Sequence, residues 1–205
     1  MIHIECSWSR GSVSYIHNKK QLRIQNLARN TNRRRKASIV NHRVRVGARR
    51  NTNPRRSGRM VGSVLGRSGC CTNGSGNFTC TTADCASSQV ACNGAGSIPP
   101  ASLVELTLAE NGGQDFCDVS LVDGFNLPVT LVPQGRSGVC PCTGRSGNVN
   151  TVCPAELAVK GSDGSVVACK SACLALNQPQ YCCTGDFGTL DKCPPTDYSK
   201  IFKTQ

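Results

Sequence analysis

The chain has 205 residues, of which 38% are hydrophobic and only 4% aromatic, so a large conventional apolar core is excluded. Its net charge of +12 comes from one end, because residues 1–69 carry seventeen Lys or Arg against one acid and residues 70–205 carry seven against eleven. The charge therefore argues for an anionic partner only at the front of the chain, and the larger part is mildly acidic.

The front segment, residues 1–62, is basic and rich in Arg, Asn and Ser. Apolar residues occur there without sustained periodicity, and Ile39–Val46 comes closest to a short strand, so we expect mostly low order. One alternative is an arm that binds nucleic acid or an anionic surface, since clustered Arg gives salt-dependent affinity. No interleaved aromatics or nucleic-acid module accompany the Arg runs, so no specific nucleic acid is expected as a partner.

The first residues also lack the apolar run of a secretion signal, and no window approaches the roughly 18 apolar residues of a membrane span. We therefore expect no transmembrane segment. A segment translated in a wrong frame, or from a mispredicted exon, would explain both the composition of residues 1–62 and the missing signal. A transcript that reads through this segment in the same frame would count against that hypothesis.

Fourteen of the fifteen cysteines lie between Cys70 and Cys193, and none of the three histidines lies in that stretch. The absence of histidines and of a Cys-x2-Cys pair argues against a zinc site. Redox catalysis usually rests on a Cys-x-x-Cys motif close to a βαβ pattern, and the sequence has neither. We expect no metal and no cofactor. The cysteines should mostly pair with each other, which indicates folding in an oxidising compartment and hence secretion.

The stretch Asp118–Pro133 predicts two short strands, because apolar residues alternate on both sides of a turn at Gly124. Pro128 inside the second run argues for an edge or irregular position. For Ala101–Ala109 the periodicity leaves a strand and a single helical turn open. The segment Lys170–Asn177 predicts a brief helix between cysteines.

Two short patterns precede these strands. Asn77-Phe78-Thr79 fits the N-glycosylation sequon and makes Asn77 a glycosylation candidate if the chain passes through the secretory pathway. Asp84, directly before Cys85, is interpreted as a structural turn residue.

Several segments in the same order resemble the thaumatin-like proteins, the plant pathogenesis-related family that includes osmotin, zeamatin and thaumatin. The segment Gly76–Cys85, with the sequence Gly-Asn-Phe-Thr-Cys-Thr-Thr-Ala-Asp-Cys, resembles the family signature. Later segments match in turn, namely Asp115–Pro128, Tyr181–Thr184 and Pro195–Lys203. The resemblance covers about residues 66–205.

This resemblance implies an all-β fold, a thaumatin-like β-sandwich with a disulfide-rich, loop-rich second domain. Residues 63–205 would form a partial thaumatin-like domain, with residues 140–193 as its disulfide-rich subdomain. Because the family's main sandwich takes strands from both termini, and both differ here, the resemblance implies an incomplete sandwich.

The family's disulfide framework, carried over position by position, implies five bridges: Cys70–Cys80, Cys85–Cys92, Cys153–Cys169, Cys173–Cys182 and Cys183–Cys193. The partner of Cys140 would lie beyond residue 205. Four further cysteines have no clear family counterpart: Cys6, Cys71, Cys117 and Cys142. We expect these five unpaired thiols to be exposed and prone to oxidation.

The resemblance also implies an acidic cleft that receives β-1,3-glucan or another fungal wall ligand, formed here by Arg67, Glu105, Asp118 and Asp123. Clustered carboxylates suit sugar recognition because each oxygen accepts a hydroxyl hydrogen bond, and an adjacent arginine keeps the acids ionised. The implied protein is a secreted, monomeric antifungal defence protein of the apoplast or vacuole, whose partner is a polysaccharide.

A weak endo-β-1,3-glucanase is the enzymatic alternative, since glycoside hydrolysis uses two carboxyl groups on either side of the scissile bond. Glu105 would be the acid, with Asp118 or Asp123 as its partner. A purely structural alternative is that Asp123 accepts backbone hydrogen bonds in the turn before Gly124, and that Asp118 ends a strand in water.

Overall fold

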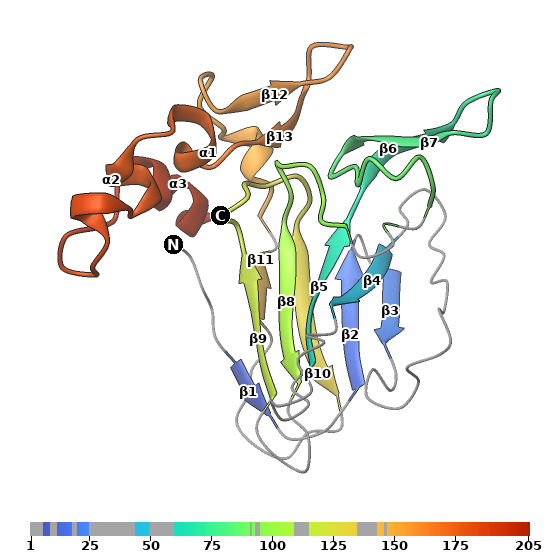
Figure 1. The fold of residues 1–205 in the computed structure, drawn as a ribbon, viewed down its shortest axis with the longest axis horizontal. Helices are drawn as coiled ribbons and strands as arrows, with labels where there is room; N and C mark the ends of the chain where they lie inside the picture. The colour runs from blue at the N-terminus through green and yellow to red at the C-terminus, as the bar shows by residue number, and fades with distance from the viewer. Residues whose placement is uncertain are drawn as a thin grey trace.

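The protein is described here from a computed structural model, which describes residues 6–8, 12–17, 20–24, 44–49, 60–90, 92, 95–108, 115–134, 143–145 and 147–205. Its larger part consists of two antiparallel sheets, and Figure 1 shows β8 and β9 of the first sheet in front of β10 and β11 of the second. The first sheet has the order β1 (Cys6–Trp8), β9 (Asp115–Ser120), β8 (Leu103–Leu108), β5 (Met60–Gly66) and β4 (Val44–Arg49). The second has the order β11 (Thr143–Arg145), β10 (Val129–Gln134), β2 (Ser12–His17) and β3 (Lys20–Ile24).

A row of valines explains why the three central strands of the first sheet associate. Val64, Val104 and Val119 are register partners across β5, β8 and β9, and all three are buried. β-Branched side chains favour extended backbone, and their burial on one face leaves the alternate residues on the other face. We call the valine side the inner face and the opposite side the outer face.

The expectation of low order for residues 1–62 is not what the structure shows in the parts of that segment that it describes. β1, β2, β3 and β4 lie there, and β4 overlaps the end of the Ile39–Val46 stretch. β1 pairs with β9 and β2 with β10, both far along the chain, whereas β3 pairs with β2 and β4 with β5, its neighbours in sequence. Composition does not report such long-range pairing. The Arg33–Lys36 run lies outside the described residues.

The strands expected after residue 100 are present, with two differences. Leu103–Leu108 is a strand rather than a helical turn, because it is paired on both sides, by β5 and β9. Pro128 lies directly before β10 instead of inside it, and β10 is an interior strand between β11 and β2. The expected edge position is therefore wrong for β10, whereas Pro128 itself lies outside the regular strand, which agrees with the irregular alternative.

A separate hairpin follows β5. It consists of β6 (Ser68–Thr72) and β7 (Phe78–Thr82), and in Figure 1 it projects from the upper end of the sandwich. Asp84 stabilises the base of this hairpin: its carboxylate accepts hydrogen bonds from the backbone N–H of Cys80 at 2.8 Å and of Ala86 at 2.6 Å. The interpretation of Asp84 as a turn residue is confirmed.

Residues 147–205 form a smaller, mixed region at the same end. A two-stranded sheet, β12 (Ala158–Lys160) and β13 (Val166–Cys169), is followed by helices α1 (Ala172–Leu176), α2 (Pro179–Cys182) and α3 (Asp197–Thr204), with short 3-10 turns η1 (Val149–Thr151) and η2 (Gly185–Phe187). The predicted helix at Lys170–Asn177 is confirmed as α1. The Ser171 hydroxyl caps it by accepting a hydrogen bond from the Leu174 N–H, and Asn177 ends it in a left-handed conformation.

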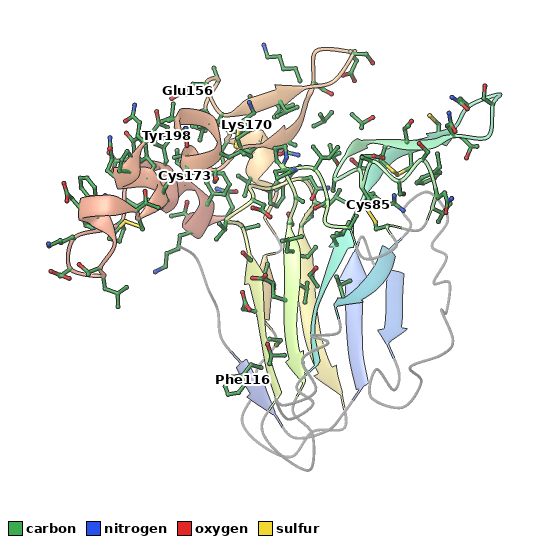
Figure 2. All side chains as sticks on the ribbon, viewed as in Figure 1. Cys85, Phe116, Glu156, Lys170, Cys173 and Tyr198 are labelled. Carbon is green, nitrogen blue, oxygen red and sulfur yellow. A yellow bond between two sulfur atoms is a disulfide. The ribbon has the colours of Figure 1, made fainter. Side chains whose placement is uncertain are left out.

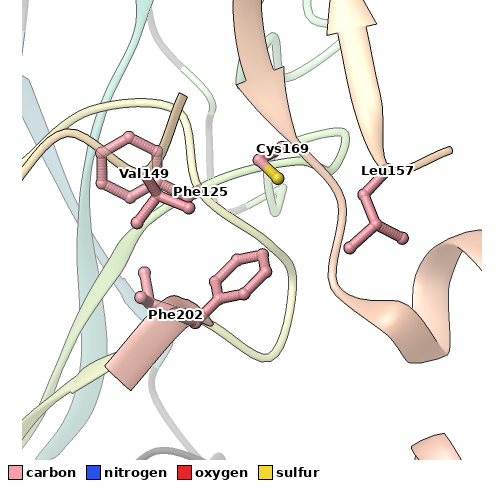
Figure 3. Packing of buried hydrophobic residues seen from close by; sticks show 6 residues of the cluster. Phe125, Val149, Leu157, Cys169 and Phe202 are labelled. Carbon is pink, nitrogen blue, oxygen red and sulfur yellow. The ribbon is translucent and has the colours of Figure 1, made fainter. Parts of the chain in front are cut away.

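One hydrophobic cluster joins this smaller region to the sandwich (Figure 3). Phe125, from the loop after β9, packs with Val149, Leu157, Cys169 and Phe202, and all five are buried. Phe125 and Cys169 also exchange two backbone hydrogen bonds of 2.8 Å. Burial of each large side chain contributes about 1.5–3 kcal/mol, so the cluster holds the loop after β9 in place.

Five disulfides connect described residues, and they are the pairs that the resemblance implies: Cys70–Cys80, Cys85–Cys92, Cys153–Cys169, Cys173–Cys182 and Cys183–Cys193. Cys71 and Cys117 are free thiols. Cys71 is exposed, as expected, but Cys117 is buried on the inner face, so its expected exposure is wrong. The side chains of Cys6, Cys140 and Cys142 lie outside the described part of the chain.

Candidate functional site

Glu105 and Asp118 stand directly opposite each other on neighbouring strands. They are register partners in the antiparallel pair β8–β9, one position from the buried partners Val104 and Val119. Because side chains alternate along a strand, both carboxylates belong to the outer face. Directly opposite residues of an antiparallel pair have Cβ atoms about 4.5–5.5 Å apart. The register therefore brings two of the four predicted site residues together.

The surroundings of this pair are polar on one side and aromatic on the other. Ser63 is the partner of Glu105 on β5, and Thr107 is the partner of Phe116 two positions along the β8–β9 ladder. Phe116 is 36% exposed and lies at the end of the sheet away from the β6–β7 hairpin (Figure 2). Since Phe116 and Asp118 share a face, the carboxylate pair has an accessible aromatic ring beside it.

Asp123 lies in the turn that follows β9. Its backbone carbonyl accepts a hydrogen bond from the Ala101 N–H at 3.0 Å, and the Gly124 N–H closes the turn on the Leu121 carbonyl at 3.0 Å. The Asp123 carboxylate, which is partly exposed, has no hydrogen-bond partner within the described residues. The turn therefore uses the backbone of Asp123 and not its carboxylate.

Arg67 directly follows β5 and is almost completely buried, with 1% of its surface exposed. One guanidinium nitrogen, Nη2, donates to the Val90 carbonyl at 2.5 Å, and the guanidinium carbon lies 4.9 Å from the centre of the Phe78 ring. A cation over an aromatic face in a desolvated place is a favourable contact of about 2 kcal/mol. These two contacts hold the β6–β7 hairpin and the segment near Cys92 against the upper end of the sheet.

Asn126 supports the loop beside the site, a role that its sequence position did not indicate. Its side-chain nitrogen donates to the Gly66 carbonyl and to the Thr82 hydroxyl, both at 2.9 Å, and its oxygen accepts from the Ser102 N–H at 3.0 Å. Asn126 is buried, so these bonds replace water completely. A single side chain thus ties together the ends of β5, β7 and β8, next to the Asp123 turn. The position of Asn126 directly after Gly124-Phe125 gave no signal of this role.

Three other carboxyl groups have a lowered pKa, and all lie in residues 147–205. The backbone N–H of Glu156 and the Tyr198 hydroxyl lower the pKa of Glu156. Hydrogen bonds from Ser165 lower the pKa of Asp163, and one from the Thr189 hydroxyl lowers that of Asp191. Each partner lies in the same short region as its acid, and Figure 2 places Glu156 and Tyr198 with the helices, away from Phe116. Asp163 and Asp191 thus stabilise local turns, and Glu156 links its loop to α3.

No three His, Cys, Asp or Glu side chains among the described residues cluster in a way that would hold a metal ion. None of the helices that they form has the length and apolar character to cross a membrane.

Comparison with known proteins agrees with the fold. Residues 24–205 match the model of the Thaumatin family. Thaumatin-like protein 1 of Pyrus pyrifolia is 69% identical over 144 residues, which are 70% of this chain and 59% of that protein. Thaumatin-like protein 1 of Prunus persica is 63% identical over 144 residues, which are 70% of this chain and 58% of that protein.

A protein of Prunus avium named glucan endo-1,3-beta-glucosidase is 60% identical over 141 residues, which cover 69% of this chain and 58% of that protein. The chain therefore spans less than two thirds of the length of these three relatives.

Proposed function

The chain belongs to the thaumatin family and has its disulfide-rich, all-β fold, and from this premise we propose that it is a plant defence protein that binds a fungal wall polysaccharide, β-1,3-glucan or a related polymer. Glu105, Asp118 and Asp123 would bind the sugar. The observation that carries this proposal is the register of β8 and β9, which sets Glu105 opposite Asp118 on the outer face.

The chemistry of this face suits a neutral polymer of hydroxyl groups. Two neighbouring carboxylates offer several acceptor positions for sugar hydroxyls, and hydrogen bonds to a charged acceptor are the stronger kind. The Phe116 ring on the same face offers an apolar surface for the C–H side of a sugar ring. Asp123 adds a carboxylate that the turn leaves available to a ligand.

Arg67 has a different part in this proposal. Its guanidinium is buried against Val90 and Phe78, so little of it is accessible for direct contact with sugar. We assign to Arg67 the support of the cleft wall and a positive charge that balances the acids. The proposed location is extracellular or vacuolar, because five disulfides require an oxidising compartment for their formation.

A weak endo-β-1,3-glucanase is the second candidate function, and it is supported by the name of the Prunus avium relative. Retaining glycosidases hold their two carboxyl groups about 5–5.5 Å apart, and residues directly opposite in an antiparallel pair allow such a separation. In that reaction Glu105 would protonate the leaving oxygen and Asp118 would act on the sugar carbon.

Binding to insoluble β-1,3-glucan, together with a reducing-sugar assay, tests both candidates. We expect the chain to sediment with the glucan without release of reducing sugar. Glu105→Gln and Asp118→Asn keep the shape of each side chain but remove its charge, so each should weaken binding about tenfold, the equivalent of about 1.4 kcal/mol for one lost charged hydrogen bond.

Asp186→Asn is the matched control, because it removes the charge of an exposed carboxylate in η2. It should bind glucan like the unaltered chain. Equal binding by all three variants would refute a role for the pair. Release of sugar that Glu105→Gln abolishes would establish the hydrolase instead of the binding protein.

A further inference from the structure

The tip of the β6–β7 hairpin presents a glycosylation sequon in a suitable arrangement. Asn77 directly precedes β7, and Phe78 and Thr79 are its first two residues. Asn77 and Thr79 are exposed, whereas Phe78 between them is 6% exposed and lies under the Arg67 guanidinium. Strand alternation thus buries the middle residue of the sequon and turns the acceptor and the hydroxyl residue to solvent.

A second sequon, Asn73-Gly74-Ser75, lies four residues earlier and provides an internal comparison. The side-chain oxygen of Asn73 accepts hydrogen bonds from the backbone N–H of Ser75 at 3.0 Å and of Asn77 at 2.9 Å, so this side chain shapes the turn. The side-chain amide of Asn77 makes no hydrogen bond to any described residue. The fold therefore uses Asn73 and leaves the Asn77 amide available.

The hairpin tip also has room for a bulky group. A Cβ atom added at Gly74 or at Gly76 would meet nothing within 4 Å. By contrast, one added at Gly69, at the base of the same hairpin, would collide with the Thr81 hydroxyl. The glycines at the tip therefore have open space around them, which leaves room for an attached sugar chain.

From these observations we infer that Asn77 is an N-glycosylation site. Transfer from a lipid-linked oligosaccharide diphosphate would form a bond between Asn77 Nδ2 and C1 of the first N-acetylglucosamine. The bond between C1 and the diphosphate oxygen breaks, and the lipid diphosphate leaves with the amide proton. The inference rests on the secretory location proposed above but not on glucan binding.

Translation of the full chain behind an added endoplasmic-reticulum leader, in the presence of microsomes, tests the site directly. Only chains protected from added protease are scored, so the native location does not affect the result. We expect one gel shift that an endoglycosidase reverses, and peptide mass spectrometry should find aspartate in place of Asn77 after enzymatic deglycosylation. The shift should be lost in Asn77→Gln and in Thr79→Ala, which keeps the acceptor.

Two variants serve as controls. Asn73→Gln removes the competing sequon and Thr81→Ala removes an exposed threonine from the same strand, and both should keep the shift. An unshifted protected chain would overturn the inference, and so would a shift that persists in Asn77→Gln and disappears in Asn73→Gln. Glucan binding by the unglycosylated chain is measured in a separate experiment. A failure of the glycosylation inference can therefore be told apart from a failure of the proposed glucan binding.

Discussion

At the scale of the single residue, the two free thiols of the described chain are in opposite environments. Cys71 is exposed on β6, whereas Cys117 is 2% exposed on the inner face of β9. Burial, with the neighbouring Asp118 charge as the smaller cause, raises the pKa of Cys117 from 9.0 to about 12. The two cysteines should therefore differ strongly in reactivity.

Alkylation of the native chain, followed by peptide mass spectrometry, measures this difference. Because the pKa of Cys117 is about 12 instead of 9.0, its thiolate fraction at a given pH is about a thousandfold below that of an ordinary thiol. We expect Cys71 to be labelled rapidly and Cys117 only after unfolding. Labelling of both at equal rates in denaturant is the control, and equal rates in the native chain would contradict the buried position.

The same pKa fixes the sign of a pH effect on stability. The unfolded thiol ionises near 9.0 while the folded thiol holds its proton to about 12, so stability that is present below pH 9.0 is lost as the pH rises through that window. Cys117→Ala removes this titration, and the free energy of unfolding should then fall less steeply above pH 9.0. An unchanged slope would count against the raised pKa.

At the scale of the element, the turn after β9 depends on Gly124. Gly124 has a φ of +87°, and a Cβ atom there would lie 2.5 Å from the Cys169 carbonyl and 2.9 Å from Pro100 Cβ. Gly76 has nearly the same conformation, with a φ of +81°, but nothing lies within 4 Å of its added Cβ. A substitution at Gly76 therefore tests backbone strain alone, whereas one at Gly124 tests strain and steric clash together.

We therefore expect Gly124→Ala to destabilise the chain much more than Gly76→Ala. The left-handed conformation alone costs an L-residue about 1–2 kcal/mol, and the clash with the backbone of residue 169 adds about 1–3 kcal/mol. Chemical denaturation of both variants measures the difference. Equal losses would show that the β13 backbone moves away from the turn at little cost.

Sequence patterns identified elements well where local signals decide them. The segment Lys170–Asn177 between cysteines indicated α1, and apolar alternation in Asp118–Pro133 indicated the strands β9 and β10. The same reasoning missed β1–β4, because an Arg- and Asn-rich segment carries no clear apolar alternation and its strands depend on pairing, with near neighbours in β2–β3 and β4–β5 and with distant partners in β1–β9 and β2–β10. β8 stayed ambiguous for the same reason, since its strand conformation comes from pairing on both sides.

At the scale of the whole molecule, the disulfides differ in what surrounds them. Cys153–Cys169 and Cys183–Cys193 close loops with sequence separations of 16 and 10. Loop entropy alone makes the first more stabilising by only about 0.4 kcal/mol. However, Cys169 is fully buried in the cluster with Phe125 and Phe202, whereas Cys183 and Cys193 are partly exposed.

We expect the double variant Cys153→Ala, Cys169→Ala to lose at least about 1 kcal/mol more stability than Cys183→Ala, Cys193→Ala, because it also leaves a cavity in the buried cluster. Thermal unfolding of both double variants under non-reducing conditions measures this. A similar loss in both would mean that loop closure alone accounts for the contribution of these bridges.

The sequence by itself determined that the cysteines of residues 70–193 have no histidines among them and should pair with each other, and the order of its segments carried the family resemblance that named the candidate acids. Only the tertiary structure decided that Glu105 faces Asp118, that Cys117 is buried and Cys71 exposed, and that Asn126 joins three strand ends. The physical reason is that strand register and burial depend on contacts between residues far apart in the chain, so no local window contains them.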